Sequence, residues 1–296
     1  KMFMRLLVFG NKHKVNLIPH FSGFFKRLKE CGVNVLFEHD LSSYLINNGV
    51  NDFKDYSTFH VEDRAALIGD LVVSLGGDGT FLNTANIVAE KQIPILGINL
   101  GRLGFLTDVQ DCDLDSLPEI ILNNNFLVEP RTMLKTKIPL DNCVVEKYAL
   151  NEIAVLKQDL SSMISINAYL NGEYLHEYQA DGLIVSTPTG STAYSLSVGG
   201  PILMPQSPNL IIVPVASHSL TVRPIVIPDD LDIELRVNSR SGSFLISLDG
   251  RSKVLSQDVF VRISKAPFVV NTVRLHGHSF FTTLKTKLMW GVDARK

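Results

Sequence analysis

The chain has 296 residues, of which 45% are hydrophobic and 20% charged, and its formal net charge is −2. This length suits two domains with a substantial buried core, and the near-neutral charge argues against a general polyanion binder, so any nucleotide site must be built locally. No apolar run approaches the roughly 20 residues that a membrane-spanning helix needs. The three widely spaced cysteines form no disulfide framework. We therefore expect a cytoplasmic protein without a nucleic-acid or membrane partner.

The first third of the chain alternates strand-like and helix-like segments. Strands are predicted at 5–10, 32–38, 70–75 and 94–99, and helices at 17–30, 41–46 and 81–90. Such alternation is typical of a parallel, Rossmann-like sheet with helices on both faces. Ligands bind such sheets at the carboxyl ends of the strands.

One of those strand ends carries an unusual turn, Gly76-Gly77-Asp78-Gly79-Thr80. Glycines between a strand and a helix let backbone N–H groups approach phosphate oxygens, and the helix N-terminus adds partial positive charge. A carboxylate among phosphates needs a compensating role, such as holding Mg²⁺ or accepting a proton from an attacking hydroxyl. The alternative is a tight turn in which Asp78 merely caps the helix. Arg102, in the loop after the next strand, is either a phosphate contact or a plain surface charge.

Past residue 127 the pattern changes to short β-rich segments with turn residues between them. Strands are predicted at 132–138, 144–155, 162–170, 173–178, 182–187, 210–215, 231–237, 244–248 and 259–263. Asn171-Gly172 is a strong two-residue hairpin signal. A mostly antiparallel β-sandwich is therefore expected, followed by a C-terminal helix at 279–290 that returns to the first domain. The predicted domains are 1–128, with 271–296 packing back onto it, and 129–270.

Three further segments of the second domain are candidates for a site. Thr187–Ser197 is dense in hydroxyls, which suits a polar ligand such as a ribose or phosphate, although the segment is equally typical of a hydroxyl-rich turn capping a short helix. Asn151-Glu152 could bind a diol or an amine but is a weak signal alone. Asp249-Gly250 resembles a hairpin turn, so Asp249 is assigned a structural role.

Taken together, these segments resemble the NAD kinase family, in its bacterial form. The resemblance rests on the glycine-rich turn, on Asn151-Glu152, on Asp181-Gly182 and on the run from Thr187 to Ser197, in that order and spacing. It extends to Gly97–Leu106 and Arg223-Pro224 and so spans nearly the whole chain. The glycine-rich turn alone is not specific, because diacylglycerol kinases, sphingosine kinases and 6-phosphofructokinases have closely related turns. The hydroxyl-rich run together with the Asn-Glu pair is highly specific.

The resemblance implies an enzyme that transfers a phosphoryl group from ATP, or from polyphosphate, to the 2′-hydroxyl of the adenosine ribose of NAD, giving NADP. It implies a divalent cation such as Mg²⁺, with ligands that remain unassigned, and a homotetramer or homodimer. Asp78 would be the general base. Gly76, Gly77, Gly79 and Thr80 would hold the donor phosphates and metal. The NAD site would comprise Asp78, Gly79, Asn151, Glu152, Asp181, Thr192, Ala193, Tyr194, Ser195, Leu196, Ser197 and Ala216.

One position departs from the family pattern. Many relatives have an arginine two residues before the Asp-Gly pair, where this chain has Gln179. A charge-assisted contact to the pyrophosphate or the acceptor ribose is therefore not expected there. Three other classes of protein fit the sequence less well. A lipid or small-alcohol kinase would need an acyl channel, and a non-catalytic nucleotide-binding regulator would have no use for Asp78. A dehydrogenase is disfavoured because no Gly-x-Gly-x-x-Gly precedes an acidic residue about 20 positions on.

Overall fold

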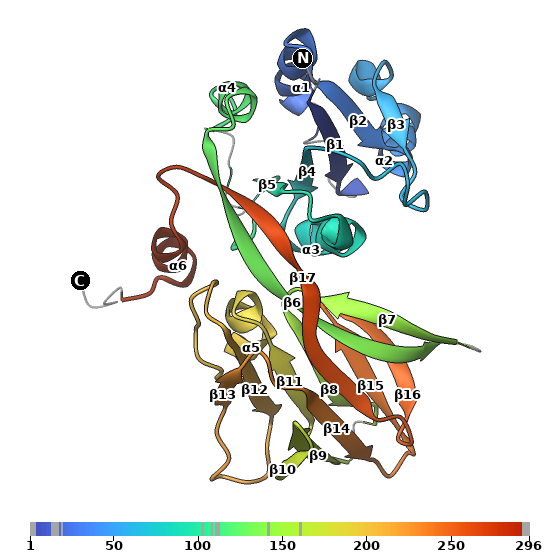
Figure 1. Ribbon diagram of the computed structural model, residues 1–296, viewed down its shortest axis with the longest axis vertical. Coiled ribbons are helices and arrows are strands. Elements are labelled where there is room, and N and C mark those ends of the chain that lie inside the picture. The colour runs from blue at the N-terminus through green and yellow to red at the C-terminus, as the bar shows by residue number, and fades with distance from the viewer. Residues whose placement is uncertain are drawn as a thin grey trace. The chain divides into compact units, whose positions relative to one another are not determined.

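The computed structural model describes residues 4–12, 18, 20–101, 104–107, 109, 113–140, 143–159 and 162–291. The chain divides into two compact units, Lys1–Pro130 with Val270–Lys296, and Arg131–Val269. Strands β6 (Phe126–Leu140) and β17 (Val261–Leu275) are 15 residues each and contribute to both units, as Figure 1 shows.

The first unit is built on a parallel sheet, as predicted. Its strands are β1 (Arg5–Gly10), β2 (Asn34–Glu38), β3 (Ser57–Phe59), β4 (Leu71–Gly76) and β5 (Ile95–Asn99), in the order β5-β4-β1-β2-β3. The last part of β17 adds to β5 in parallel, with Thr272 opposite Ile95. Every residue of β4 and β5 is buried, as expected for a parallel sheet that is covered on both faces.

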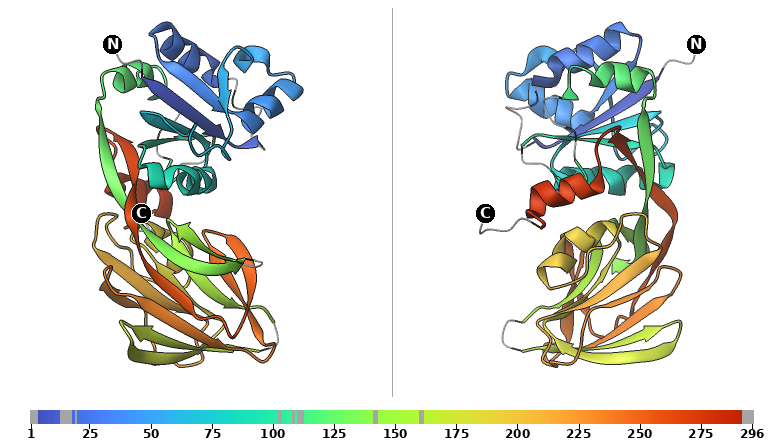
Figure 2. Two further views of the ribbon diagram at one scale, coloured as in Figure 1. Left: turned by 45° about the vertical axis from the view of Figure 1, so that its right-hand side comes forward. Right: turned by 90° about the vertical axis from the view of Figure 1, so that its left-hand side faces the viewer.

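Helices cover both faces of this sheet (Figure 2). One face packs against α1 (Ser22–Glu30), α2 (His39–Asn47) and α4 (Leu117–Leu122), whose apolar side chains form one core with alternate residues of β1 and β4. Helix α3 (Asp78–Val88) buries Phe81, Ala85 and Val88 outside that cluster. The C-terminal helix α6 (Phe280–Leu288) begins after Ser279, whose hydroxyl accepts the Thr282 N–H at 3.1 Å. Short 3₁₀ turns are η2 (Asn51–Phe53) and η3 (Ala89–Lys91).

The second unit is the predicted antiparallel β-sandwich. One sheet has the order β13-β12-β11-β8-β15-β16, with strands Ile225–Pro228, Asn209–Val215, Gly182–Ser186, Glu152–Lys157, Ser243–Leu248 and Arg251–Ser256. The facing strands are β10 (Glu173–Ala180), β9 (Ile164–Leu170), β14 (Ile233–Asn238) and β17, and β7 (Cys143–Ala149) pairs with β6. One apolar core includes Ile153 and Phe244 from the first sheet and Ile166 and Ile233 from the second, so the sheets pack face to face. Turn η5 (Thr189–Thr192) and helix α5 (Tyr194–Ser197) follow β11.

The structure also corrects some predicted elements. The single strand predicted at 144–155 is wrong, because β7 ends at Ala149, β8 begins at Glu152, and Leu150-Asn151 forms a bend between them. Helix α3 begins at Asp78 rather than at residue 81. Elements β3, α4, β13 and β16 were not predicted; β13 lies at a sheet edge, and β16 is a polar edge strand. The predicted hairpin at Asn171-Gly172 is present, and both residues have positive φ. Within the described chain, every helix falls short of the length or the apolar content needed to cross a membrane.

Candidate active site

Asp78 is the first residue of α3, and its side chain does not cap that helix. Its two oxygens instead accept the backbone N–H groups of Phe105 (2.9 Å), Leu106 (3.0 Å) and Thr107 (3.2 Å), together with the Thr107 hydroxyl at 3.1 Å. The capping alternative is therefore wrong. A carboxylate held by several donors is fixed in position and orientation. It is still partly exposed, since 29% of its side-chain surface is accessible.

The glycines around Asp78 differ in what they do. A Cβ on Gly104 would overlap the Asp78 carboxylate, and one on Gly76 would overlap the Thr80 hydroxyl, so these two positions need glycine for packing. Neither Gly77 nor Gly79 has a positive φ, and a Cβ on either would meet nothing within 4 Å. Their lack of a side chain is thus not explained by conformation or packing. It leaves open space directly over the turn.

That space adjoins a hollow of about 470 Å³ at the carboxyl ends of β1, β2 and β4. Gly77, Gly79 and Thr80 line one side, and Asn83, Gly10, Asn11, Lys12 and Glu38 complete it. Lys12 pairs with Asp40 at 3.0 Å. Burial raises the pKa of the Glu38 carboxyl, which the charge of Lys12 partly opposes. This is the position at which open parallel sheets bind phosphorylated ligands. Arg102 lies outside the described residues.

A lysine that the sequence did not single out reaches the same turn. The Lys287 ammonium group, on α6, lies 3.4 Å from Asp78 Oδ2 and 4.7 Å from the centroid of the Phe105 ring. The Phe105 ring is in turn 6.3 Å from that of Phe280 at the start of α6. The C-terminal helix thereby brings a positive charge to the glycine-rich turn, where negative charge would accumulate on a bound nucleotide.

In the second unit, the backbone of Asn151 is held at both its N–H and its carbonyl. Its carbonyl oxygen accepts the Thr187 N–H at 2.9 Å and the Ser186 hydroxyl at 3.3 Å. Gly190 packs directly on that carbonyl, which a Cβ there would overlap. The Thr187 hydroxyl also donates to the Leu150 carbonyl at 2.6 Å. The Asn-Glu pair and the hydroxyl-rich segment, predicted separately, therefore form one hydrogen-bonded junction.

The other side of this junction is held by Asp249, a residue assigned only a turn role from the sequence. Its carboxylate accepts the N–H groups of Leu150 (2.8 Å), Asn151 (2.8 Å) and Glu152 (3.1 Å). The Asp249 side chain is 1% exposed, and burial raises its pKa against the lowering effect of these three hydrogen bonds.

The Glu152 carboxyl group is buried beside Asp249. One oxygen accepts the Tyr194 N–H, while Oε2 has no partner among the described residues. Burial is the main cause that raises the pKa of Glu152 to about 7, and the nearby Asp249 carboxylate adds to it. Ionising this group without a bound donor is therefore unfavourable, and a ligand that donates to Oε2 would relieve the penalty.

This shift predicts a pH-dependent gain of stability in the Glu152→Gln variant. In the wild-type protein the folded-state pKa of Glu152 is about 7, above the ordinary 4.5. The folded protein therefore has its full stability below pH 4.5, where Glu152 is neutral in both states, and loses stability as the pH rises through 7. At pH 8 the neutral glutamine should be the more stable by up to about 3 kcal/mol, which corresponds to a thermal midpoint higher by roughly 5 °C. At pH 4.5 the two proteins should melt together.

The matched control is Glu173→Gln, which removes an exposed carboxylate from the same unit. Its melting temperature should differ from that of the wild type by the same small amount at both pH values. A Glu152→Gln difference that is also independent of pH would contradict the burial of an ionisable Glu152.

The hydroxyl-rich run contains further buried polar atoms without partners. The Thr189 and Ser195 hydroxyls are both buried and, within the described chain, have no hydrogen-bond partner. By contrast, Ser191 is satisfied by the Pro188 carbonyl and by the Leu203 N–H. Native proteins rarely leave buried polar groups unpaired, so such a set near Glu152 Oε2 indicates a polar ligand or ordered water. Tyr194, at the start of α5, is 37% exposed beside them.

Asp181 and Ala216 lie at the opposite end of β11. Gly182 pairs with Val215, and the Asp181 N–H donates to the Val215 carbonyl, so Ala216, directly after the neighbouring strand, lies next to Asp181. The φ of Ala216 is +47°. Asp181 pairs with Lys157 at 2.7 Å. At about 3.3 Å per residue, Asp181 is roughly 20 Å along the strand from Thr187. The structure therefore separates the predicted NAD residues of this unit into two groups. Gln179 is exposed on β10.

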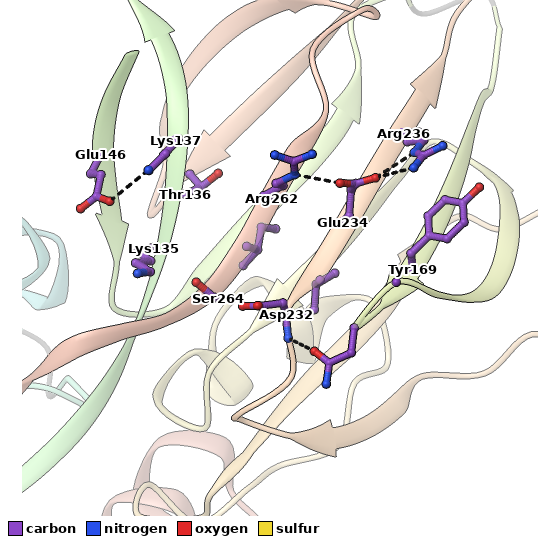
Figure 3. A pocket seen from close by; sticks show the side chains of 14 residues that line it. Lys135, Thr136, Lys137, Glu146, Tyr169, Asp232, Glu234, Arg236, Arg262 and Ser264 are labelled. Atoms are coloured by element: carbon purple, nitrogen blue, oxygen red, sulfur yellow. Dashed lines mark hydrogen bonds and ion pairs between the residues drawn. The ribbon is translucent and has the colours of Figure 1, made fainter.

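A second hollow, about 790 Å³, lies on the outer face of β6, β9, β14 and β17 (Figure 3). Five of its charged side chains pair with one another. Glu234 binds Arg236 and Arg262 at 2.7 and 2.8 Å, and Lys137 faces Glu146 at 3.8 Å. Because these five groups are already paired, most of the charge that lines the hollow is neutralised within it. None of the predicted site residues lines it.

The part of the chain that the structure describes contains no cluster of protein side chains suited to hold a metal ion, since no group of three His, Cys, Asp or Glu side chains gathers there as ligands. Mg²⁺ commonly binds through substrate phosphates and waters, with few protein ligands.

An open glycine-rich turn at the carboxyl end of a parallel sheet, with a fixed carboxylate beside it, characterises a nucleotide-binding phosphotransferase. Comparison with known proteins narrows this class. Residues 6–126 match the ATP-NAD kinase N-terminal domain, and residues 150–275 match the ATP-NAD kinase C-terminal domain. The chain belongs to the ATP-NAD kinase family.

Individual members of this family align with the chain over nearly its full length. The chain is 45% identical to an NAD kinase of Bacteroides fragilis, covering 99% of this chain and 100% of the relative. It is 43% identical to one of Porphyromonas gingivalis, covering 98% and 99%. Yeast NADH kinase complexed with NADH has the same fold, with a TM-score of 0.86 and 22% identity over 98% of this chain and 89% of that one. An NAD kinase from Archaeoglobus fulgidus in complex with ATP gives a TM-score of 0.70 and 25% identity, covering 97% and 99%.

Proposed function

We propose that this chain is an NAD kinase that transfers the γ-phosphoryl group of ATP to the 2′-hydroxyl of the adenosine ribose of NAD, giving NADP and ADP. The observation that carries the donor half is the open space over Gly77 and Gly79 beside the fixed Asp78 carboxylate. The acceptor half is supported by the Asn151–Glu152 junction and its unpartnered buried polar atoms. Family membership supports both substrates.

In this proposal Asp78 is the general base. Its carboxylate takes the proton of the 2′-hydroxyl as the oxygen attacks the γ-phosphorus, and the bond from that phosphorus to the β,γ-bridging oxygen breaks to release ADP. The backbone N–H groups of the turn and the Lys287 ammonium offset the negative charge of the transferred group. Gly76 and Thr80 shape the turn, whereas Gly77 and Gly79 leave room for the phosphates. Mg²⁺ is proposed to arrive bound to the ATP phosphates.

In the second unit, Asn151 and Glu152 are proposed to hold the adenosine of NAD. Thr192, Ala193, Tyr194, Ser195, Leu196 and Ser197 form the proposed pocket for its base and ribose. Asp181 and Ala216, at the far end of β11, are proposed to bind the other end of the dinucleotide, and the separation along the strand suits an extended ligand. The proposed protein is a cytoplasmic homo-oligomer.

The direct test is incubation of the purified protein with ATP, Mg²⁺ and NAD, followed by detection of NADP with an NADP-specific dehydrogenase. NADP formation that requires ATP is the expected result. Phosphorylation of a lipid or small alcohol without NADP formation would overturn the proposal.

The open turn also makes a prediction in which activity and stability change in opposite directions. Gly79→Ala adds a methyl group where nothing lies within 4 Å, at the second residue of α3. Because alanine favours a helix over glycine by about 1 kcal/mol, the variant should be slightly more stable. Its KM for ATP should nevertheless rise at least about tenfold, which is roughly 1.4 kcal/mol of binding, since the methyl group occupies the phosphate space.

Gly23→Ala is the matched control, because Gly23 is the second residue of α1 and its Cβ would also meet nothing within 4 Å. It should gain similar stability without any change in KM. An unchanged KM for ATP in Gly79→Ala would contradict the proposal that the ATP phosphates bind at this turn.

A further inference from the structure

Asp249 occupies a hairpin turn that does not itself require a charged residue. Asp249 and Gly250 join β15 to β16 with φ values of +47° and +80°. Such turns accept Asn-Gly or Gly-Gly as readily as Asp-Gly. The same chain builds an equivalent turn with Asn171 and Gly172, whose φ values are +48° and +84°. The carboxylate at residue 249 therefore needs a reason beyond the turn.

The reason lies in what the side chain contacts. Asp249 is buried, and its carboxylate accepts three consecutive backbone N–H groups at 2.8 to 3.1 Å, those of residues 150–152. Its own N–H donates to the Glu152 carbonyl at 3.2 Å. These contacts cover the bend at which β7 gives way to β8. The side chain thus holds the N–H side of the same peptides whose carbonyl side is held by Thr187.

Burying a carboxylate is unfavourable unless it is well hydrogen-bonded, and here it also lies near a second carboxyl group, that of Glu152. The Arg251 guanidinium lies 4.0 Å from the Asp249 carboxylate. Water or neutral side chains could satisfy the N–H groups of this bend without burying a charge. A buried carboxylate in their place indicates that the geometry of the Asn151–Glu152 pair is important.

We infer that Asp249 is a positioning residue of the acceptor site: by accepting the N–H groups of residues 150–152, it fixes the Asn151 and Glu152 side chains in the geometry that receives NAD. The inference rests on the proposed role of that pair in binding NAD. It adds a residue to the site from a hairpin about 100 residues farther along the chain, since Asp249 and Asn151 are 98 positions apart.

The test compares Asp249→Gly with Asn171→Gly. Both changes keep a turn of positive φ and remove its side-chain acceptor, but within the described chain the Asn171 side chain accepts a single N–H group, that of Asp232 at 2.8 Å. NAD and ATP dissociation constants are measured by calorimetry on the full chain. We expect Asp249→Gly to weaken NAD binding at least tenfold with ATP binding within twofold, and Asn171→Gly to leave both within twofold. An NAD constant for Asp249→Gly within threefold of that for Asn171→Gly would overturn the inference.

The Asp249→Asn variant supplies a readout that a merely structural role would not move. Asparagine suits the turn and keeps one acceptor oxygen but removes the charge beside Glu152. A ligand hydroxyl or amino group that donates to Glu152 Oε2 favours the ionised carboxylate, so wild-type NAD affinity should rise as the pH increases through about 7. In Asp249→Asn the midpoint should move to lower pH, because only burial then raises the pKa of Glu152. A midpoint that does not move overturns the inference.

The two proposals fail in different ways. If the wild-type protein binds no NAD and forms no NADP, the proposed function fails and this inference fails with it. If the wild-type protein forms NADP but Asp249→Gly binds NAD as Asn171→Gly does and Asp249→Asn leaves the pH midpoint unchanged, the proposed function stands and only the role of Asp249 is removed.

Discussion

Asp78→Asn is expected to lower kcat by about 10³-fold while the NAD dissociation constant stays within about tenfold, or roughly 1.4 kcal/mol. The amide cannot take the proton of the attacking hydroxyl, so the loss falls on the chemical step. Binding should survive because the amide oxygen can still accept the Leu106 and Thr107 N–H groups that anchor the loop. The measurements are steady-state kinetics and NAD calorimetry.

A control is needed because Asp78 also organises the loop at residues 105–107. Thr107→Val removes the hydroxyl bond to Asp78 Oδ1 but keeps the carboxylate. Its kcat should fall by no more than a few fold. If kcat fell as far in Thr107→Val as in Asp78→Asn, the Asp78 carboxylate would contribute by ordering the loop rather than by accepting a proton. Retention of most of kcat in Asp78→Asn would remove the general-base role altogether.

The second large effect is expected at Gly190. In Gly190→Ala the new Cβ would overlap the Asn151 carbonyl oxygen and lie 2.6 Å from the Ser186 hydroxyl, where everything nearby is buried. Such overpacking should destabilise the protein by about 1–3 kcal/mol. Because the backbone that must move carries Asn151 and Glu152, NAD binding should weaken by about 100-fold, or roughly 2.7 kcal/mol.

Ile166→Ala separates the loss of binding from the loss of stability. Ile166 is fully buried in the sandwich core, and truncating it should cost about 2–5 kcal/mol without touching Asn151. Its NAD constant should remain near that of the wild type. Equal weakening of NAD binding in both variants would mean that general loosening of the sandwich, rather than the junction, determines affinity.

Much of this architecture is predictable because its signals are local. The alternation of the first third predicts a parallel sheet, since strands buried on both faces and amphipathic helices have distinct hydrophobic periods. Asn171-Gly172 predicts its hairpin because glycine and asparagine tolerate the positive φ of that turn. The continuous strand predicted at 144–155 is wrong because β-rich residues flank the bend at Leu150-Asn151 on both sides. Only tertiary contacts mark that break.

The site was less predictable, because its geometry depends on partners far apart in the sequence. Lys287 and Asp78 are separated by 209 positions, and no local pattern distinguishes Lys287 from Lys285 on the same helix. Asp249 reads as an ordinary turn residue until its three N–H partners are known. The glycine-rich turn is evident in the sequence, but a sequence cannot tell that Gly76 is packed whereas Gly77 and Gly79 face open space.

Residue 151 is positioned by hydrogen bonds to its main chain, and this has a consequence for redesign. Asp249, Thr187 and Ser186 grip N–H and carbonyl groups that every amino acid except proline possesses. The Asn151 side chain is therefore not needed to keep its own backbone in place. Libraries that vary residue 151 should yield folded proteins with altered nucleobase preference. Libraries at residue 190 should return almost only glycine.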